Sequence, residues 1–282
     1  MKAFGLFSVV LALSLSAQAW IPTTRQILNK TTDNSGSGIY AIEQEVQFPN
    51  GAETLNLKET WLIDSDRTMR LTVTGTKEQA STIKLQFLYQ GGQRHRLVDG
   101  TRRTEKISDD FLEKYLNFRS SDVMANVLTH MKIIPSNAMV RRGGAKGADF
   151  KNAPEDWVRF SRTGGVVNYA FGTPTPVDQS DSNPGLWIEQ DQFVVRKVRL
   201  PSQAEMTADN YSGYSKGLRY PKSRTIRWDK NTASIRLISA SPRPQSAAGL
   251  LQPNSLDVSQ KVDGLADMAA KDAVIEFYSR FR

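Results

Sequence analysis

Apolar and polar residues alternate along much of the chain, and the pattern is clearest in residues 186–240. Within residues 193–200, valine and leucine side chains fall on one side of the chain, and the charged Lys197 and Arg199 fall on the other. A period of two is typical of β-strands, so this alternation predicts a sheet with one face in water. Turn-forming residues interrupt the pattern repeatedly. We therefore predict several short strands in succession over this stretch.

The same period extends over residues 40–98. Pro49-Asn50-Gly51 and Gly91-Gly92 are turn signals between the apolar stretches. Short turns between successive strands predict an antiparallel meander. Its inward face is unusually large, because it carries the aromatic side chains of Tyr40, Phe48, Trp61, Phe87 and Tyr89.

The period changes to that of a helix in residues 108–131. One apolar stripe follows Ser108 and two aspartates, and a second follows Ser120-Ser121-Asp122. Serine and aspartate favour helix starts, so the pattern predicts two amphipathic helices that lay their apolar faces on the sheet. The stripes consist of Phe111, Leu112, Tyr115, Leu116, Val123, Met124, Val127, Leu128 and Met131.

The first residues have the pattern of a secretory signal. Residues 1–19 contain Lys2, an apolar run and Ala17-Gln18-Ala19, which is a small-x-small cleavage site. The apolar run is too short to cross a bilayer of roughly 30 Å. We therefore predict that residues 1–19 form a signal peptide that is cleaved after Ala19, and that the chain is periplasmic without a lipid anchor. Residues 20–29 are expected to form a short helix, because Pro22 suits a first helical turn.

Residues 241–282 are predicted to form a proline-rich linker followed by a C-terminal helix. The prolines favour an extended segment. From Leu265 the spacing predicts a helix, with an apolar face of Val274, Phe277, Tyr278 and Phe281. We expect this helix to dock on its own domain, and docking on a protein partner is the alternative.

The composition excludes several kinds of chemistry. A chain of 282 residues without cysteine has no disulfide framework, thiolate zinc site, cysteine nucleophile or acylated cysteine of a bacterial lipoprotein. The formal net charge is +8, but the basic residues are scattered singly, which favours solvated strand faces over a polyanion site. Contact with anionic lipid headgroups or acidic partners stays open. No nucleic-acid partner is expected.

Catalytic groups are sparse in the sequence. The two histidines, His95 and His130, belong to no metal-binding motif, and the sequence contains no Gly-x-Ser-x-Gly element. The basic, glycine-rich residues 141–147 lack the spacing of a nucleotide-binding loop, although a looser role in holding an anion stays open. We predict a protein that is not an enzyme and that uses no cofactor and no metal. A hydrolase with scattered catalytic groups is a third reading.

Two stretches of the sequence resemble the Lol-type superfamily of periplasmic lipoprotein carriers and outer-membrane receptors. The first is residues 186–198, which begin Leu186-Trp187-Ile188, and the second is the tyrosine- and glycine-rich residues 210–221. The rest of the chain is similar only in the order of its elements. The resemblance implies an α+β fold that is mainly β: a strongly curved antiparallel sheet, forming an unclosed barrel covered by amphipathic helices.

In that superfamily the helices form a lid over a hydrophobic cavity that takes acyl chains. The resemblance therefore implies a soluble periplasmic carrier that binds lipid or the acyl chains of lipoproteins, acts in outer-membrane lipoprotein sorting or lipid transfer, and contacts membranes transiently. Residues 20–240 would form the lipid-binding domain, with a helical lid at about residues 108–131. The acyl chains are expected to contact Trp61, Phe87, Leu112, Leu116, Met124 and Leu128.

The patterns are compatible with either a cavity or a dry core between the sheet and the helices. A non-enzymatic envelope sensor or protein-interaction module on the same fold is therefore the alternative function, with an envelope protein bound through the C-terminal helix. Such a module would lose its partner but keep its fold when residues 263–282 are deleted. If the deletion unfolds the domain, docking of the helix on its own domain is the better explanation.

Overall fold

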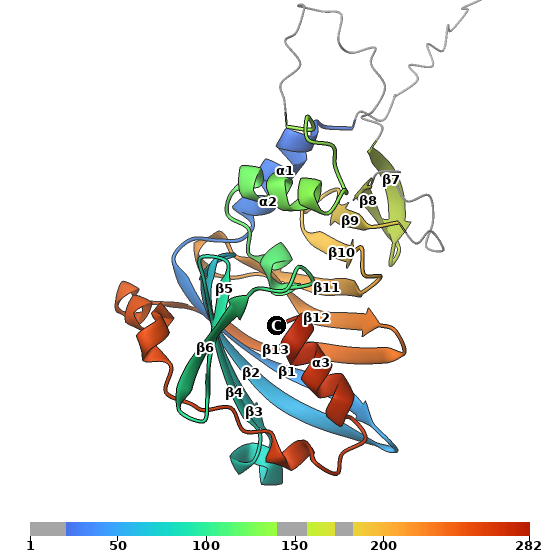
Figure 1. The fold of residues 1–282 in the computed structure, drawn as a ribbon. Coiled ribbons are helices and arrows are strands. Elements are labelled where there is room, and N and C mark those ends of the chain that lie inside the picture. The colour runs from blue at the N-terminus through green and yellow to red at the C-terminus, as the bar shows by residue number, and fades with distance from the viewer. Residues whose placement is uncertain (1–20, 140–156, 173–182) are drawn as a thin grey trace, which may run out of the picture.

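The computed structural model describes residues 21–139, 157–172 and 183–282. Within them, 13 strands form one curved antiparallel sheet in the order β6-β5-β4-β3-β2-β1-β13-β12-β11-β10-β9-β8-β7, which is not closed into a barrel (Figure 1). The predicted fold class is thus confirmed. The strands are β1 (Ile39–Asn50), β2 (Glu53–Ser65), β3 (Thr68–Gly75), β4 (Lys84–Gln90), β5 (Gln93–Val98), β6 (Thr101–Lys106), β7 (Val158–Thr163), β8 (Val166–Phe171), β9 (Gly185–Glu189), β10 (Val195–Arg199), β11 (Glu205–Gly213), β12 (Arg219–Trp228) and β13 (Asn231–Arg243).

Two meanders meet in the middle of the sheet. Strands β1 to β6 and β7 to β13 each pair in sequence order, and β1 pairs with β13; we call this pairing the seam. At the seam, Val46 faces Ile235 of β13 on one side and Leu57 of β2 on the other. All three side chains are buried, so the predicted alternation produces one apolar face that continues from the first meander into the second.

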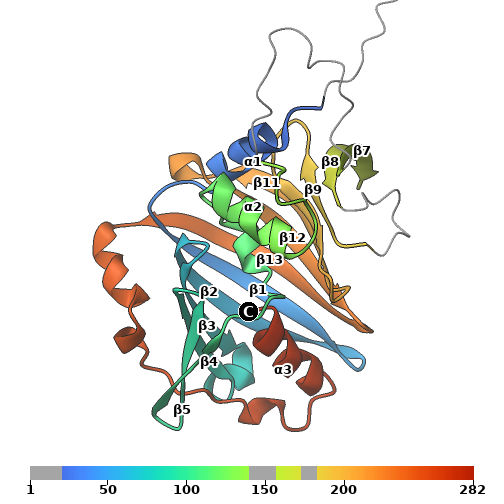
Figure 2. The same ribbon diagram turned by 45° about the horizontal axis from the view of Figure 1, so that its top comes forward.

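In the described residues, three α-helices accompany the sheet: α1 (Thr24–Asp33), α2 (Ser121–His130) and α3 (Lys271–Arg280). Helix α1 begins later than predicted, because Thr23 and Gln26 form a capping box and Pro22 lies before it. Helices α1 and α2 lie side by side near strands β9 to β11, whereas α3 lies on the concave side of the sheet near β1, β12 and β13 (Figures 1 and 2). Helix α3 therefore covers strands on both sides of the seam.

The prediction of the first of two helices within residues 108–131 is wrong. Only a 3₁₀ turn forms there, Glu113–Leu116. The amide of Leu112 donates a hydrogen bond, 3.3 Å long, to the carbonyl oxygen of Phe281, which is distant in sequence. Glu113 is fully buried, although a helix would place it on the polar face. Contacts distant in sequence thus override the local pattern. The second predicted helix is confirmed as α2, which Ser120 caps.

The wet face predicted for residues 193–200 is also wrong. Lys197 and Arg199 are each only 6% exposed. Their cationic groups lie 2.8 and 3.2 Å from the Glu205 carboxylate and 4.9 and 5.5 Å from the centre of the Trp187 ring. An opposite charge and an aromatic face allow basic side chains to be buried. Alternation alone does not distinguish this face from a solvated one.

The chain after β13 crosses from one side of the sheet to the other. Residues 244–270, which we call the strap, run along the convex face (Figures 1 and 2). There the carboxylate of Asp257 accepts hydrogen bonds from Arg70 and Gln86, each 2.9 Å long. The predicted helix start at Leu265 falls in a 3₁₀ turn of the strap. Helix α3 follows the strap and lies on the concave face.

A close backbone approach at the end of β3 makes Gly75 intolerant of a side chain. A Cβ atom on Gly75 would lie 2.4 Å from the carbonyl oxygen of Gln79. We expect Gly75→Ala to lower the free energy of unfolding by about 1–3 kcal/mol, which is typical of overpacking, in urea unfolding experiments. Gly213→Ala is the matched control, because a Cβ atom at this strand position has nothing within 4 Å. Equal midpoints for the two variants would contradict the close approach.

Candidate functional site

Aromatic side chains line the concave face of the first meander. Trp61 on β2 stacks on Tyr89 of β4 with ring centroids 5.8 Å apart, and Tyr89 stacks on Phe111 at 4.8 Å. All three side chains are buried. Trp61 and Tyr89 occupy inward-facing positions of the alternating pattern on their strands, and Phe111 packs on them from the stretch that follows β6. So large an apolar surface must be covered to be stable in water.

Helix α3 provides that cover. Its Phe277 ring meets Phe48 of β1 edge-on at 5.1 Å and lies 5.9 Å from Trp228 of β12, and Phe281 lies 5.1 Å from Trp228. The helix therefore spans the seam. The four residues predicted to form its apolar face are at most 3% exposed. The prediction that this helix docks on its own domain is confirmed.

The C-terminal end of α3 is held by Arg94 of β5. The Nη1 atom of Arg94 donates hydrogen bonds to the carbonyl oxygens of Tyr278, Ser279 and Arg282 at 2.8, 3.0 and 2.6 Å. A cation at this end of a helix complements the unpaired carbonyl groups and the helix dipole. Arg94 is in turn paired with Glu105 at 2.9 Å, so its charge is balanced where it is buried.

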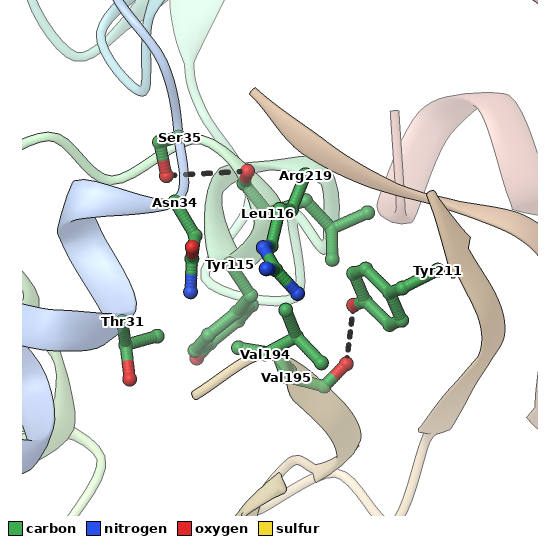
Figure 3. A pocket seen from close by; sticks show the side chains of 9 residues that line it. All are labelled: Thr31, Asn34, Ser35, Tyr115, Leu116, Val194, Val195, Tyr211 and Arg219. Atoms are coloured by element: carbon green, nitrogen blue, oxygen red, sulfur yellow. Dashed lines mark hydrogen bonds between the residues drawn. The ribbon is translucent and has the colours of Figure 1, made fainter. Parts of the chain in front are cut away.

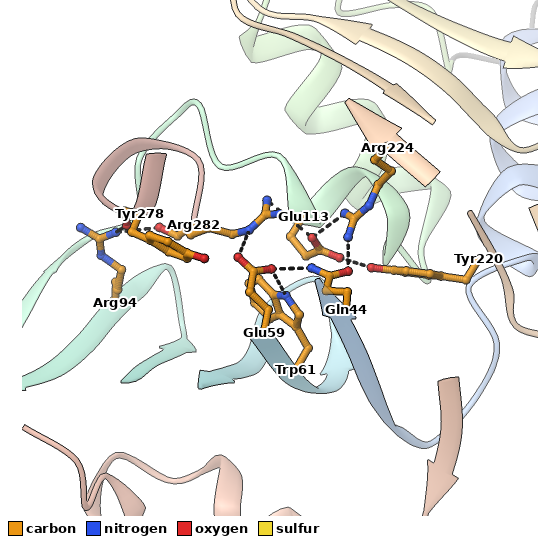
Figure 4. Close-up of polar contacts among 9 residues, drawn as sticks. All are labelled: Gln44, Glu59, Trp61, Arg94, Glu113, Tyr220, Arg224, Tyr278 and Arg282. Atoms are coloured by element: carbon orange, nitrogen blue, oxygen red, sulfur yellow. Dashed lines mark hydrogen bonds and ion pairs between the residues drawn. The ribbon is translucent and has the colours of Figure 1, made fainter. Parts of the chain in front are cut away.

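A network of buried charges lies between α3 and the sheet (Figure 4). Arg224 of β12 donates to the Glu113 carboxylate at 2.8 Å, and Arg282 donates to the Glu59 carboxylate of β2 at 3.1 Å. Gln44 of β1 links the two pairs, because it donates to Glu59 and accepts from Arg224. The four charged side chains are at most 1% exposed. Each has an opposite charge beside it, which is the condition for burying it.

The environment of Glu113 lowers its pKa. Burial raises the pKa, but the guanidinium groups of Arg224 and Arg282 and the Tyr220 hydroxyl outweigh burial and hold the pKa below its ordinary value of 4.5. The unfolded chain therefore binds this proton first as the pH falls. The stabilisation from ionised Glu113 is present above about pH 4.5 and is lost as the pH falls through the lower pKa of the folded state.

We expect the urea midpoint to fall between about pH 6 and about pH 3, in part through Glu113. Glu113→Gln is the comparison, because the amide does not titrate. Its midpoint should start lower at neutral pH and should depend less on pH in this range. Identical pH dependence in the two proteins would contradict the lowered pKa.

The six residues predicted to contact acyl chains all lie in the interior, each at most 6% exposed. Trp61 and Phe87 lie on the concave face beside Tyr89. Leu112 and Leu116 belong to the stretch around the 3₁₀ turn, and Met124 and Leu128 are buried on α2. All six join one continuous core that also includes α3. The structure thus brings all six into one core.

A small pocket borders this set at Leu116 (Figure 3). The pocket lies between α1, the 3₁₀ turn and strands β10 to β12. Its volume is about 20 Å³, which is room for about one water molecule. In this conformation it is too small for an acyl chain. The other lining residues are Thr31, Asn34, Ser35, Tyr115, Val194, Val195, Tyr211 and Arg219.

The sequence predictions missed the polar side chains of the interior, although a signal for them exists. Gln44 lies between the inward-facing Ile42 and Val46, and Glu59 lies between the inward-facing Leu57 and Trp61. Both occupy positions where a period of two requires an inward side chain. A polar residue in the apolar register of a strand predicts a buried polar contact. Gln44 and Glu59 are cross-strand partners, as that signal would require.

Within the part of the chain that the structure describes, no helix is long and apolar enough to cross a membrane. The same residues contain no group of three or more histidine, aspartate or glutamate side chains that could hold a metal ion. The predicted signal peptide of residues 1–19 and the basic residues 141–147 lie outside the described residues.

No model of a known protein family matches the sequence, and no curated protein does. Solved structures do match. A LolA superfamily protein from Nitrosomonas europaea aligns over 84% of this chain and 100% of its own, with 11% identity and a TM-score of 0.52. An outer membrane lipoprotein-sorting protein domain from Vibrio parahaemolyticus aligns over 82% and 97%, with 11% identity and a TM-score of 0.48. A DUF1329 family protein from Desulfovibrio piger aligns over 83% and 98%, with 8% identity and a TM-score of 0.49.

At this level of identity the similarity establishes a shared fold. The chain has the fold of the LolA superfamily protein from Nitrosomonas europaea, so the resemblance predicted from residues 186–198 and 210–221 is confirmed for the fold. Because one fold hosts different functions, the activity must be argued from the concave face itself.

Proposed function

We propose that this chain is a periplasmic carrier that acts in outer-membrane lipoprotein sorting or lipid transfer. It binds lipid, or the acyl chains of lipoproteins, on its concave face, where the ligand takes the place of α3. The observation that carries the proposal is that the aromatic concave face is covered by a helix that takes no part in strand pairing. The fold shared with a LolA superfamily protein supports the same class of function.

Helix α3 is suited to withdrawal from the sheet. Its 10 residues are fewer than the roughly 12–15 that an isolated helix needs for stability in water, so it is helical only while docked. Its withdrawal breaks no strand pairing, and the strap leaves it attached. An acyl chain would restore the lost burial, which is worth roughly 25 cal/mol per Å² of apolar surface.

The residues predicted from the sequence keep a role in this proposal. Trp61 and Phe87 would line the face that α3 vacates. Leu112 donates its amide to Phe281 at the end of α3, and Leu116 belongs to the adjoining 3₁₀ turn, so this turn would respond to the departure of α3. Met124 and Leu128 would extend the apolar surface toward the second meander.

Titration of the purified protein with a neutral fluorescent acyl alcohol tests the proposal. We expect saturable binding, together with faster hydrogen exchange in the backbone amides of α3 but not in those of β1 or β2. The reason is that ligand and helix compete for the same surface, whereas the sheet stays intact. Solvent extraction of the protein from its native source should also release lipid.

A destabilising variant sharpens the test. Phe277→Ala weakens the docked helix, so the open state becomes more populated and the apparent affinity for the probe should rise about tenfold or more. Ile275→Ala is the matched control on the outer face of α3, where Ile275 is 45% exposed, and it should leave the affinity unchanged. If neither the original chain nor Phe277→Ala takes up the probe, the proposal is wrong and the protein-interaction alternative gains.

A further inference from the structure

Arg282, which follows α3 in the chain, inserts a cation into the concave face. The Arg282 guanidinium lies between two carboxylates, with its Nε atom 3.1 Å from Glu59 and its Nη1 atom 3.7 Å from Glu113 (Figure 4). We propose that the ligand is an amphiphile with a positively charged group, such as a primary ammonium, that takes the place of this guanidinium beside Glu59. This inference rests on the proposed function, because the ligand must replace α3.

The charges that remain without α3 require a cation. Glu113 belongs to the 3₁₀ turn and keeps Arg224 of β12, 2.8 Å away. Glu59 loses Arg282 and keeps only neutral donors, the Gln44 amide and the Trp61 indole. The emptied face would thus present one carboxylate without an ion-pair partner, and a ligand that covered the face would bury it. A neutral or anionic ligand would leave that charge unpaired, which is costly at a buried site.

The guanidinium group of Arg282 leaves some of its hydrogen-bond donors unsatisfied between Glu59 and Glu113. The Nη1 and Nη2 atoms of Arg282 are buried and have no hydrogen-bond partner among the described residues. Of the five donors of a guanidinium, only the Nε donor is used. The planar group instead lies over the rings of Trp61 and Phe277, at 5.7 and 4.7 Å. A smaller ammonium, which has three donors, would leave fewer donors unsatisfied beside Glu59.

Two variants that differ in one functional group isolate the carboxylate. Arg282→Met removes the competing cation, and Glu59→Gln/Arg282→Met also replaces the carboxylate by an amide. Both carry the same end of α3, and their folds are compared by urea unfolding. Dodecylammonium, dodecanol and dodecyl sulfate, each below its micelle concentration, are used to displace a neutral fluorescent acyl alcohol. The readout is the ratio of the ammonium affinity to the alcohol affinity.

We expect Arg282→Met to bind dodecylammonium about tenfold more tightly than dodecanol, which is the effect of one charge-assisted hydrogen bond, with dodecyl sulfate weakest. The ratio should fall to about one in Glu59→Gln/Arg282→Met. The unsubstituted protein provides a second measurement. It should bind the three amphiphiles in the same order of affinity as Arg282→Met. Equal ratios in both variants would overturn the inference while leaving a carrier of acyl chains. Failure of all three amphiphiles to bind any of the proteins would overturn the proposed function as well.

Discussion

Arg224→Met is expected to lower the free energy of unfolding by about 3–5 kcal/mol, because it removes the nearer of the two guanidinium groups that balance the buried Glu113 carboxylate. The Arg224 side chain is 1% exposed and that of Glu113 is fully buried, with 2.8 Å between Nη1 and Oε2. Methionine keeps most of the length of the side chain, so the lost charge dominates the effect. Urea unfolding at neutral pH measures it.

Two further variants identify the cause. Arg236→Ala removes a partner of Glu45 at 3.1 Å, but Arg236 is 65% exposed, and an exposed ion pair contributes at most about 1 kcal/mol. The double variant Glu113→Gln/Arg224→Met removes both charges and should recover part of the stability lost in Arg224→Met. If Arg224→Met costs no more than Arg236→Ala, the carboxylate is not confined as the structure indicates.

Phe277→Ala is expected to lower the free energy of unfolding by about 3–5 kcal/mol, which is typical of removing a fully buried aromatic ring. Its ring contacts Phe48, Trp228, Tyr278 and Phe281 with centroids 5.1 to 6.1 Å apart. Truncation would open a cavity in the middle of the contact between α3 and the seam. Thermal or urea unfolding measures the loss.

Ile275→Ala provides the control within the same helix. Ile275 is 45% exposed, so its truncation should change stability by no more than about 0.5 kcal/mol. The contrast between two neighbouring positions tests whether α3 is docked as described. Similar small losses at both positions would mean that the helix does not cover the concave face in solution.

The strands with a strong period of two were predictable from the sequence. Stretches such as β1 and β2 alternate because one face is buried, so pattern and position have the same cause. Strand β6 escaped prediction because residues 101–106 contain no large apolar side chain. It lies at the edge of the sheet, where strand pairing requires no buried face. An edge strand of this kind forms through backbone hydrogen bonds to the neighbouring strand, and these bonds produce little signal in the amino-acid composition.

The helical stripes correctly predicted which side chains around residues 111–116 are buried. They did not predict the backbone conformation of these residues. Phe111, Leu112, Tyr115 and Leu116 are all buried as expected, yet they lie around a 3₁₀ turn. The amide of Leu112 is bonded to Phe281, far along the chain. Local periodicity carries no information about such a partner. The same reason explains why the sequence could not place α3 on the concave face beside the seam.

Part of the interior of the candidate site was predictable from the sequence. The aromatic lining follows directly from the alternation, as Trp61 and Phe87 demonstrate. The charged network does not, because Glu59 meets Arg282 and Glu113 meets Arg224 only after both meanders and α3 have come together. A polar residue in an apolar register indicates that a partner exists, but it does not identify the partner.

The seam between β1 and β13 has a consequence for how the chain reaches its native state. Each meander contains mostly contacts between neighbours in sequence, whereas the seam joins Ile39 to Arg243. Closing so long a loop costs entropy before any contact compensates for it, and such contacts slow folding. Gln44 and Glu59 come from one meander and Arg224 from the other, so the charged network completes only when the seam closes. We therefore expect two fast-forming halves and a slow joining step, in which mispaired charges delay the final docking.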